Sequence, residues 1–158
     1  MSTHAISRIH FVCLGNICRS PLVEVVARER LRRMGMAIEV VSSGTDGWHV
    51  GKGADARMQA AAHAAGYDLA SHRARQFDVR DLPQCDLILV MDRSNLSDIQ
   101  RLAQPVPVAG VALFLPWSGI DEPQEFPDPY YGDEAGFAAS VALAERGVAG
   151  LISRLARR

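Results

Sequence analysis

The chain has few cysteines and few aromatic side chains. It holds three cysteines in 158 residues, and Phe, Trp and Tyr together make up 6% of it. Three cysteines cannot complete the disulfide framework of a small secreted domain, and the N-terminus lacks the apolar segment of a signal peptide. We therefore expect a protein of the reducing cytoplasm.

A large excess of charge of one sign is also missing. The formal net charge is −1, which does not indicate a basic surface for nucleic acid or a bulk attraction to membranes. No apolar run approaches the roughly 20 residues that cross a bilayer. The five histidines and three cysteines show no zinc-site spacing. We expect no nucleic-acid partner, no membrane partner, no cofactor and no metal, while the oligomeric state stays open.

The composition that is present suits one soluble domain over residues 1–158, since 48% of the chain is hydrophobic and 22% is charged. Apolar runs rich in β-forming residues alternate with patterns of helical period. This alternation predicts an α/β fold with a small parallel sheet flanked by helices. The expected strands are 9–13, 37–42, 85–91 and 106–111, and the expected helices are 20–34, 54–65, 92–102 and 134–155, with a proline-bearing loop at 116–129.

The most informative segment begins at Cys13, which five residues separate from Arg19. The segment joins a predicted strand to a predicted helix, which Ser20 opens as the N-cap and Pro21 continues. A helix N-terminus carries unpaired N–H groups and attracts anions. Gly15 allows a tight turn and Asn16 tolerates a left-handed conformation. We predict an oxyanion-binding loop around Cys13 and Arg19. Its other residues are Leu14, Gly15, Asn16, Ile17, Cys18 and Ser20.

Cysteine and arginine at this spacing indicate a specific chemistry. The helix terminus and Arg19 favour the thiolate of Cys13, which makes it a nucleophile at neutral pH. The guanidinium of Arg19 can bind two phosphate oxygens at once, which a lysine cannot do. The spacing alone more often joins a structural cysteine to a surface arginine. Because this one follows a strand and runs into a helix start, we favour a catalytic phosphate site.

A candidate proton donor lies far along the chain. Asp128 precedes Pro129 on a stiff loop, where it could protonate an aryl leaving group and later deprotonate water. Tyr130 and Tyr131 follow it, and Trp48 is a further aromatic side chain that could form a wall. The alternative is packing in a turn, since Asp-Pro is common in turns.

These motifs together resemble the low-molecular-weight protein tyrosine phosphatases. The resemblance is carried by Val12–Pro21, by 42–51, by 72–76, by 91–96 and by Asp128–Gly132. It implies a four-stranded parallel sheet and metal-free hydrolysis of phosphotyrosine through a cysteinyl-phosphate. By resemblance Cys13 is the nucleophile, Arg19 the phosphate clamp and Asp128 the general acid and base. It also implies that Ser42 and His72 support the loop and that Trp48, Tyr130 and Tyr131 form walls around the substrate ring.

The resemblance further implies that Cys18 protects Cys13 through a reversible disulfide, that the substrate is a phosphotyrosine protein and that a bacterial tyrosine kinase is a partner. Two other functions stay open. An arsenate reductase on the same fold would relay oxidation through a further cysteine, and Cys85 is available. A non-catalytic phosphotyrosine-binding module would lack one of the three reactive residues. Asp92 fits a helix N-cap better than a second acid, and Cys85 fits a buried structural thiol.

Overall fold

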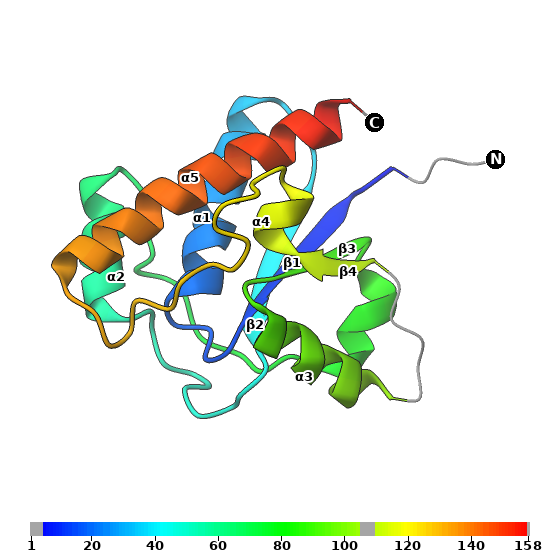
Figure 1. The fold of residues 1–158 in the computed structure, drawn as a ribbon, viewed down its shortest axis with the longest axis horizontal. Helices are drawn as coiled ribbons and strands as arrows, with labels where there is room; N and C mark the ends of the chain where they lie inside the picture. The colour runs from blue at the N-terminus through cyan, green and yellow to red at the C-terminus, as the bar shows by residue number, and fades with distance from the viewer. Residues whose placement is uncertain (1–4, 105–109, 158) are drawn as a thin grey trace.

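A computed structural model describes residues 5–104 and 110–157. Its centre is one sheet of four parallel strands in the order β2-β1-β3-β4 (Figure 1). The strands are β1 (Arg8–Cys13), β2 (Glu39–Gly44), β3 (Leu87–Val90) and β4 (Val111–Leu113). The structure confirms the expected α/β fold with a small parallel sheet.

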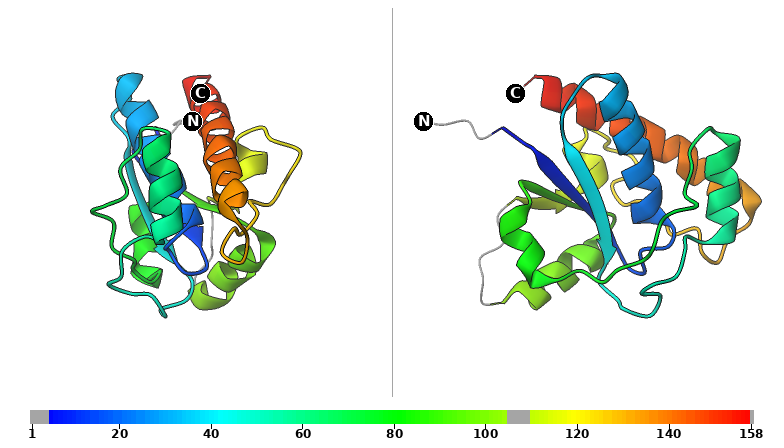
Figure 2. Two further views of the ribbon diagram at one scale, coloured as in Figure 1. Left: turned by 90° about the vertical axis from the view of Figure 1, so that its left-hand side faces the viewer. Right: turned by 180° about the vertical axis from the view of Figure 1, so that it is seen from behind.

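Helices cover both faces of the sheet. They are α1 (Arg19–Arg33), α2 (Ala56–Ala64), the 3₁₀-helix η1 (Val79–Gln84), α3 (Arg93–Ala103), α4 (Phe114–Trp117) and α5 (Glu134–Ala156). On one face α1 and α5 pack against each other, and α2 lies beside the first half of α5 (Figures 1 and 2). On the other face lie η1 and α3. The parallel strands are therefore buried between two layers, as parallel sheets require.

Alternation along β1 distributes the core between the two faces. Ile9 and Phe11 belong to the larger cluster, together with apolar residues of α1 and α5. Val12 belongs to the smaller cluster, which includes Ile88 of β3 and Ile99 of α3. Successive side chains of a strand point to opposite faces, so one strand supplies both clusters.

The expected boundaries are partly wrong. α1 begins at Arg19 with Cys18 as its N-cap, and Ser20 lies inside the first turn rather than capping it. The expected strand at 106–111 falls largely on residues outside those described, and the observed strand begins at Val111. The expected loop at 116–129 starts inside α4, and η1 was not predicted.

The closing helix matches its expected position within one residue. α5 has 23 residues and a mean hydropathy of 1.3 over its most apolar window, which suffices by length and composition to cross a bilayer. α5 is not an unbroken apolar run, because Glu145 and Arg146 lie in its middle, but its length and average composition meet this criterion. Core helices pass the same test, and α5 buries nine residues within the fold, among them Phe137, Val148 and Leu151.

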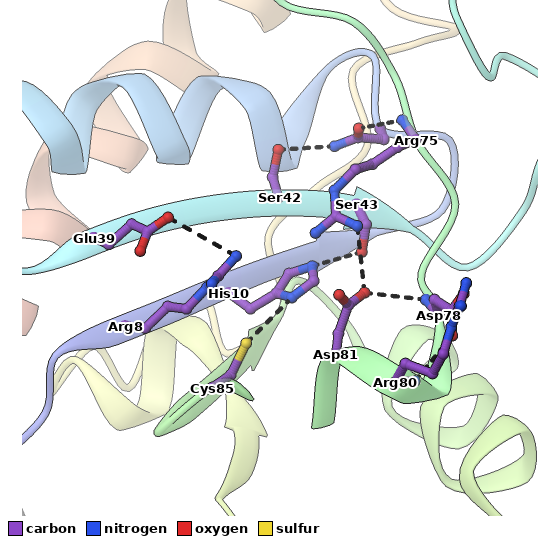
Figure 3. Close-up of polar contacts among 11 residues, drawn as sticks. Arg8, His10, Glu39, Ser42, Ser43, Arg75, Asp78, Arg80, Asp81 and Cys85 are labelled. Carbon is purple, nitrogen blue, oxygen red and sulfur yellow. Dashed lines mark hydrogen bonds and ion pairs between the residues drawn. The ribbon is translucent and has the colours of Figure 1, made fainter. Parts of the chain in front are cut away.

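A buried histidine links three segments on the face of the sheet that carries the smaller cluster. His10 of β1 is fully buried, and its Nε2 lies 2.6 Å from the hydroxyl of Ser43 on β2. Its Nδ1 lies 3.6 Å from the thiol of Cys85, so the ring joins two strands to the segment before β3 (Figure 3). Burial, followed by the nearby charge of Arg75, lowers the pKa of His10 to about 4.

This pKa predicts a loss of stability in mild acid. The unfolded chain binds a proton at His10 near pH 6.5, whereas the folded protein does so only near pH 4. Between these values the unfolded state holds more protons, so the free energy of unfolding falls as the pH falls, by about 3 kcal/mol in total. Urea unfolding at pH 7, 6, 5 and 4 would measure it. The variant His10→Asn should show a flatter profile over this window, and an equally steep one would contradict the assignment.

Candidate active site

The segment from Cys13 to Arg19, which we call the phosphate loop, lies at the carboxyl end of β1. Ligands of open α/β sheets bind at this edge. The end of β2 closes against the loop, since Thr45 N–H donates to the Cys13 carbonyl at 3.0 Å. Gly44 is required there, because a Cβ at this position would lie 2.5 Å from the carbonyl oxygen of Leu14. The sequence analysis did not identify this close approach.

Asn16 adopts the left-handed backbone conformation within the loop, with φ of 58°. The side-chain nitrogen of Asn16, Nδ2, donates to the Ser20 hydroxyl at 2.8 Å and to the Ser42 hydroxyl at 3.0 Å. Its side-chain oxygen accepts from the Arg75 N–H at 3.0 Å, and its carbonyl accepts from His72 Nε2 at 2.7 Å. All the polar groups of this buried side chain are therefore paired, which offsets the cost of its conformation.

The left-handed backbone of Asn16 confirms its expected conformation. Gly15 lies in the bend after β1 without a positive φ. A Cβ on Gly15 would lie 3.1 Å from the ring of His49, so the missing side chain also makes room for a neighbour. The backbone carbonyl of Asn16 can only accept a hydrogen bond, so the Nε2 atom of His72 that contacts it carries a proton.

The thiol of Cys13 is held by two neighbours. Asn16 N–H points at its sulfur from 3.3 Å, and the hydroxyl of Ser20 lies at 3.0 Å. The Ser20 hydroxyl accepts from the side-chain amide of Asn16, and its single hydrogen is shared between Cys13 and the carbonyl of Ser43, which lies 3.4 Å away. A donor directed at a sulfur stabilises the thiolate form. The Ser20 hydroxyl thus lies against the thiol of Cys13 instead of capping the helix.

Arg19 is a buried cation between carboxylates. Its side chain is 4% exposed, and Nη1 donates to Asp92 at 2.7 Å and to the carbonyl of Phe126 at 3.1 Å. Nη2 lies 3.6 Å from Asp128. Burial works against its charge, but Cys13 and the two carboxylates outweigh it and raise the pKa of Arg19. A permanently charged guanidinium is thereby fixed beside the thiol.

Asp92 has two roles in the structure. It caps α3 as expected, with Oδ1 accepting from the N–H of Asn95 at 2.8 Å. Its other oxygen binds Arg19. The sequence signal for the second contact was limited to the position of Asp92 at the end of β3, the neighbour of β1 in the sheet.

A crevice of about 340 Å³ opens above the loop. Cys13 and Arg19 lie in its lining with Asp128, whose carboxylate is 43% exposed. Three aromatic side chains also line it, and Trp48 and Tyr131 are largely exposed. The lining residues are Cys13, Leu14, Gly15, Ile17, Cys18, Arg19, Asp46, Trp48, His49, Asp128, Tyr130 and Tyr131. Within the described part of the chain, no cluster of three or more His, Cys, Asp or Glu residues is arranged to hold a metal ion.

The two cysteines of the loop differ in their surroundings. Cys18 also lines the crevice but is not hydrogen-bonded to Ser20 or Asn16 in the way that Cys13 is. Burial, and then the negative charge of Asp55, raises the pKa of Cys18 well above its usual range. Cys18 is therefore a neutral thiol at physiological pH.

Comparison with known proteins identifies the arrangement. The family model for low molecular weight phosphotyrosine protein phosphatase matches residues 8–158. The chain belongs to this family. A low molecular weight protein-tyrosine-phosphatase of Streptomyces coelicolor is 39% identical over 153 residues, covering 92% of each chain. The low molecular weight phosphotyrosine protein phosphatase of Homo sapiens is 37% identical over 142 residues, covering 87% of this chain and 88% of its own.

Solved structures agree with this assignment. A protein tyrosine phosphatase from Entamoeba histolytica with Hepes in the active site has a TM-score of 0.88 at 30% identity, covering 96% of this chain and 97% of its own. The tyrosine phosphatase Wzb from Escherichia coli K30 in complex with sulphate has a TM-score of 0.84 at 31% identity, covering 95% and 99%. The protein is therefore an enzyme, a protein-tyrosine phosphatase of a metal-independent family.

The structure brings most of the predicted residues of the phosphatase to one place. The loop, the three aromatic side chains and Asp128 line or support the crevice, and Ser42 and His72 hold Asn16. Sequence reasoning missed Gly44, the carbonyl of Phe126 and Glu24, which accepts from the Ser42 hydroxyl.

Cys85 lies apart from the crevice. It precedes β3 and contacts His10 on the smaller face of the sheet, whereas Cys13 ends β1 at the opposite edge. Because the strands are parallel, the start of β3 and the end of β1 lie at opposite edges. This placement gives no support to the relay from Cys13 through Cys85 that an arsenate reductase would need.

The two roles of Asp92 can be separated by one substitution. Asp92→Asn keeps Oδ1 for the cap of α3 but turns an NH₂ group toward Nη1 of Arg19, where two donors repel. We expect the cap of α3 to be kept but the free energy of unfolding to fall, because the buried guanidinium of Arg19 loses its charged partner. We also expect kcat/KM for p-nitrophenyl phosphate to fall about tenfold, because the guanidinium loses its orientation. Steady-state kinetics and thermal unfolding would check both. Full activity in Asp92→Asn would show that the contact with Arg19 is dispensable.

Proposed function

We propose that this phosphatase hydrolyses aryl phosphate monoesters, phosphotyrosine in particular, with Cys13 as nucleophile, Arg19 as phosphate clamp and Asp128 as general acid and base. The observation that carries the proposal is that a buried thiol, a buried guanidinium and a half-exposed carboxylate share one crevice. Cys13 and Arg19 belong to one short segment, whereas Asp128 lies far along the chain, so the fold alone brings the carboxylate to them.

The geometry supports a two-step reaction. The thiolate of Cys13 attacks phosphorus while Arg19 and the N–H groups of the loop bind the phosphoryl oxygens, where charge spreads in the transition state. Asp128 protonates the departing phenolate, and phosphocysteine remains. Asp128 then takes a proton from water, the water oxygen attacks phosphorus, and inorganic phosphate leaves as the Cys13 thiolate is restored.

The aromatic rim supports an aryl substrate. Trp48 is 83% exposed and Tyr131 is 94% exposed, although side chains of this size usually bury most of their surface. Exposed aromatic side chains at the mouth of a crevice can pack on the ring of a phosphotyrosine. The relatives named as phosphotyrosine protein phosphatases favour a phosphotyrosine protein as the substrate. The family resemblance adds a bacterial tyrosine kinase as one such protein.

The three cysteines bear on the compartment. Cys13, Cys18 and Cys85 are all free thiols in the structure. Free thiols suit a reducing environment, and we propose the cytoplasm as the location of the enzyme.

The role of Asp128 is tested by varying the leaving group. Asp128→Ala should lower kcat/KM for phenyl phosphate by about a hundredfold, since phenolate needs a proton to depart. p-Nitrophenolate leaves more easily without one, so its ester should lose less. Initial rates with both esters would measure the difference. An equal loss for the two would exclude Asp128 as the acid.

The accompanying control concerns the nucleophile. Cys13→Ser should abolish turnover of both esters but still bind vanadate or inorganic phosphate, because the N–H groups and Arg19 remain. Isothermal titration would detect the binding. Turnover by Cys13→Ser at the wild-type rate would refute the mechanism as a whole.

We also propose that Cys18 protects Cys13 from irreversible oxidation. Peroxide oxidises the more reactive Cys13 thiolate to sulfenic acid with release of hydroxide, and the Cys18 thiol then displaces water from the sulfenic acid to form a disulfide. A thiol reductant returns both thiols. Supporting this order, the pKa of Cys18 is raised by burial, so peroxide meets Cys18 as the less reactive neutral thiol.

Recovery of activity tests this protection. Both wild type and Cys18→Ser should lose activity in mild peroxide, but only the wild type should regain most of it with dithiothreitol. Cys85→Ser is the matched control and should recover like the wild type. If Cys18→Ser recovers equally well, Cys18 has no protective role.

A further inference from the structure

Arg57 of α2 lies between the core and the segment that carries the proposed acid. We call residues 128–131 the acid loop. The guanidinium carbon of Arg57 is 5.3 Å from the ring centroid of Tyr130, which belongs to this loop. It is also 4.6 Å from the ring centroid of Phe137, which is buried in α5. Both distances are within the range of cation–π attraction.

The other side of Arg57 is fixed by Asp55. The carboxylate of Asp55 accepts from Nε of Arg57 at 3.1 Å and from Nη2 at 2.9 Å, a two-pronged contact that sets the plane of the guanidinium. Asp55 also caps α2. Its own N–H donates to the carbonyl of Ile17 in the phosphate loop at 2.9 Å. Asp55 therefore connects Arg57 to the phosphate loop, which holds Cys13.

The contacts continue from Tyr130 to the acid. The N–H of Tyr130 donates to Oδ1 of Asp128 at 3.1 Å. The carboxylate of Asp128 is 43% exposed and lies 3.6 Å from Arg19. The side chain of Arg57 is itself 44% exposed, and ion pairs so open to water contribute little stability. These contacts therefore contribute little to stability. They fix the position of the acid loop relative to the phosphate loop, because they join the two loops through α2.

We propose that Arg57 is a positioning residue that holds the acid loop over the phosphate loop, so that Asp128 faces the leaving group. The proposal rests on the proposed role of Asp128 as the acid. Arg57 acts through Tyr130 and does not touch the phosphate. Its removal leaves the thiol, Arg19 and the loop in place but lets the acid loop depart from its productive position.

Kinetics with two esters test the proposal. Arg57→Ala should lower kcat/KM for phenyl phosphate about fivefold, which is the effect of losing one partly exposed cation–π contact. It should lower kcat/KM for p-nitrophenyl phosphate less than twofold. Arg57→Lys keeps a cation near Tyr130 and should restore part of the loss. Arg33→Ala removes an exposed arginine that pairs with Glu29 at the far end of α1 and should leave both values unchanged.

A double-variant cycle isolates the route. In the Asp128→Ala background, Arg57→Ala should cause no further loss with phenyl phosphate, since residues that act through one another are not additive. Equal losses for the two esters, or additive losses in the double variant, would overturn the proposal. A loss confined to the KM of a phosphotyrosine peptide would also overturn it, because Arg57 would then be a direct substrate contact.

Hydrogen exchange separates this proposal from the proposed function. The amide of Tyr130 should exchange faster in Arg57→Ala than in wild type and Arg33→Ala, with no substrate present. If the Tyr130 amide exchanges faster in Arg57→Ala but the wild type hydrolyses neither ester, the positioning role of Arg57 stands and the proposed function is refuted. Unchanged exchange in a protein whose Asp128→Ala variant shows the expected leaving-group dependence would refute only the role of Arg57.

Discussion

The left-handed conformation of Asn16 is the constraint on which the phosphate loop depends. It is stable because the side chain and carbonyl of Asn16 are held by Ser20, Ser42, His72 and the backbone of Arg75. These partners come from α1, β2 and the segment after α2, so three parts of the chain must be folded before the loop has its shape. In that shape the Asn16 N–H donates to the sulfur of Cys13, and the Ser20 hydroxyl lies 3.0 Å from the same atom.

Electrostatics then decide what the loop can bind. Arg19 is a buried cation with Asp92 fixed on one nitrogen and Asp128 near the other. A buried charge is tolerated only when it is paired, and Asp92 supplies the permanent partner. The contact with Asp128 is longer and more open to solvent, so Arg19 keeps one side available to an anion. The same arrangement brings the proposed acid within reach of a bound phosphate.

Much of this could be predicted from the sequence, and the errors have physical causes. The strand before Cys13, the helix after it and α5 follow from hydrophobic periodicity and cap residues, which are local. The preference of serine for caps predicts Ser20 as the N-cap, but α1 begins one residue earlier, with Cys18 as its N-cap, and the Ser20 hydroxyl lies against Cys13 instead. The contact between Asp92 and Arg19 spans 73 positions, and no local pattern could indicate it.

The sequence by itself determined the fold class, the Cys13–Arg19 loop and the candidate acid, because each depends on neighbouring residues or on a short motif. Only the tertiary structure decided that Asp128 shares a crevice with Cys13, that Gly44 must lack a side chain and that Cys85 lies at the opposite edge of the sheet. It also decided the placement of Arg57 between Phe137 and Tyr130. The physical reason is the same in each case: these contacts join distant segments, and their distances are set by how helices and strands pack rather than by the residues next to them.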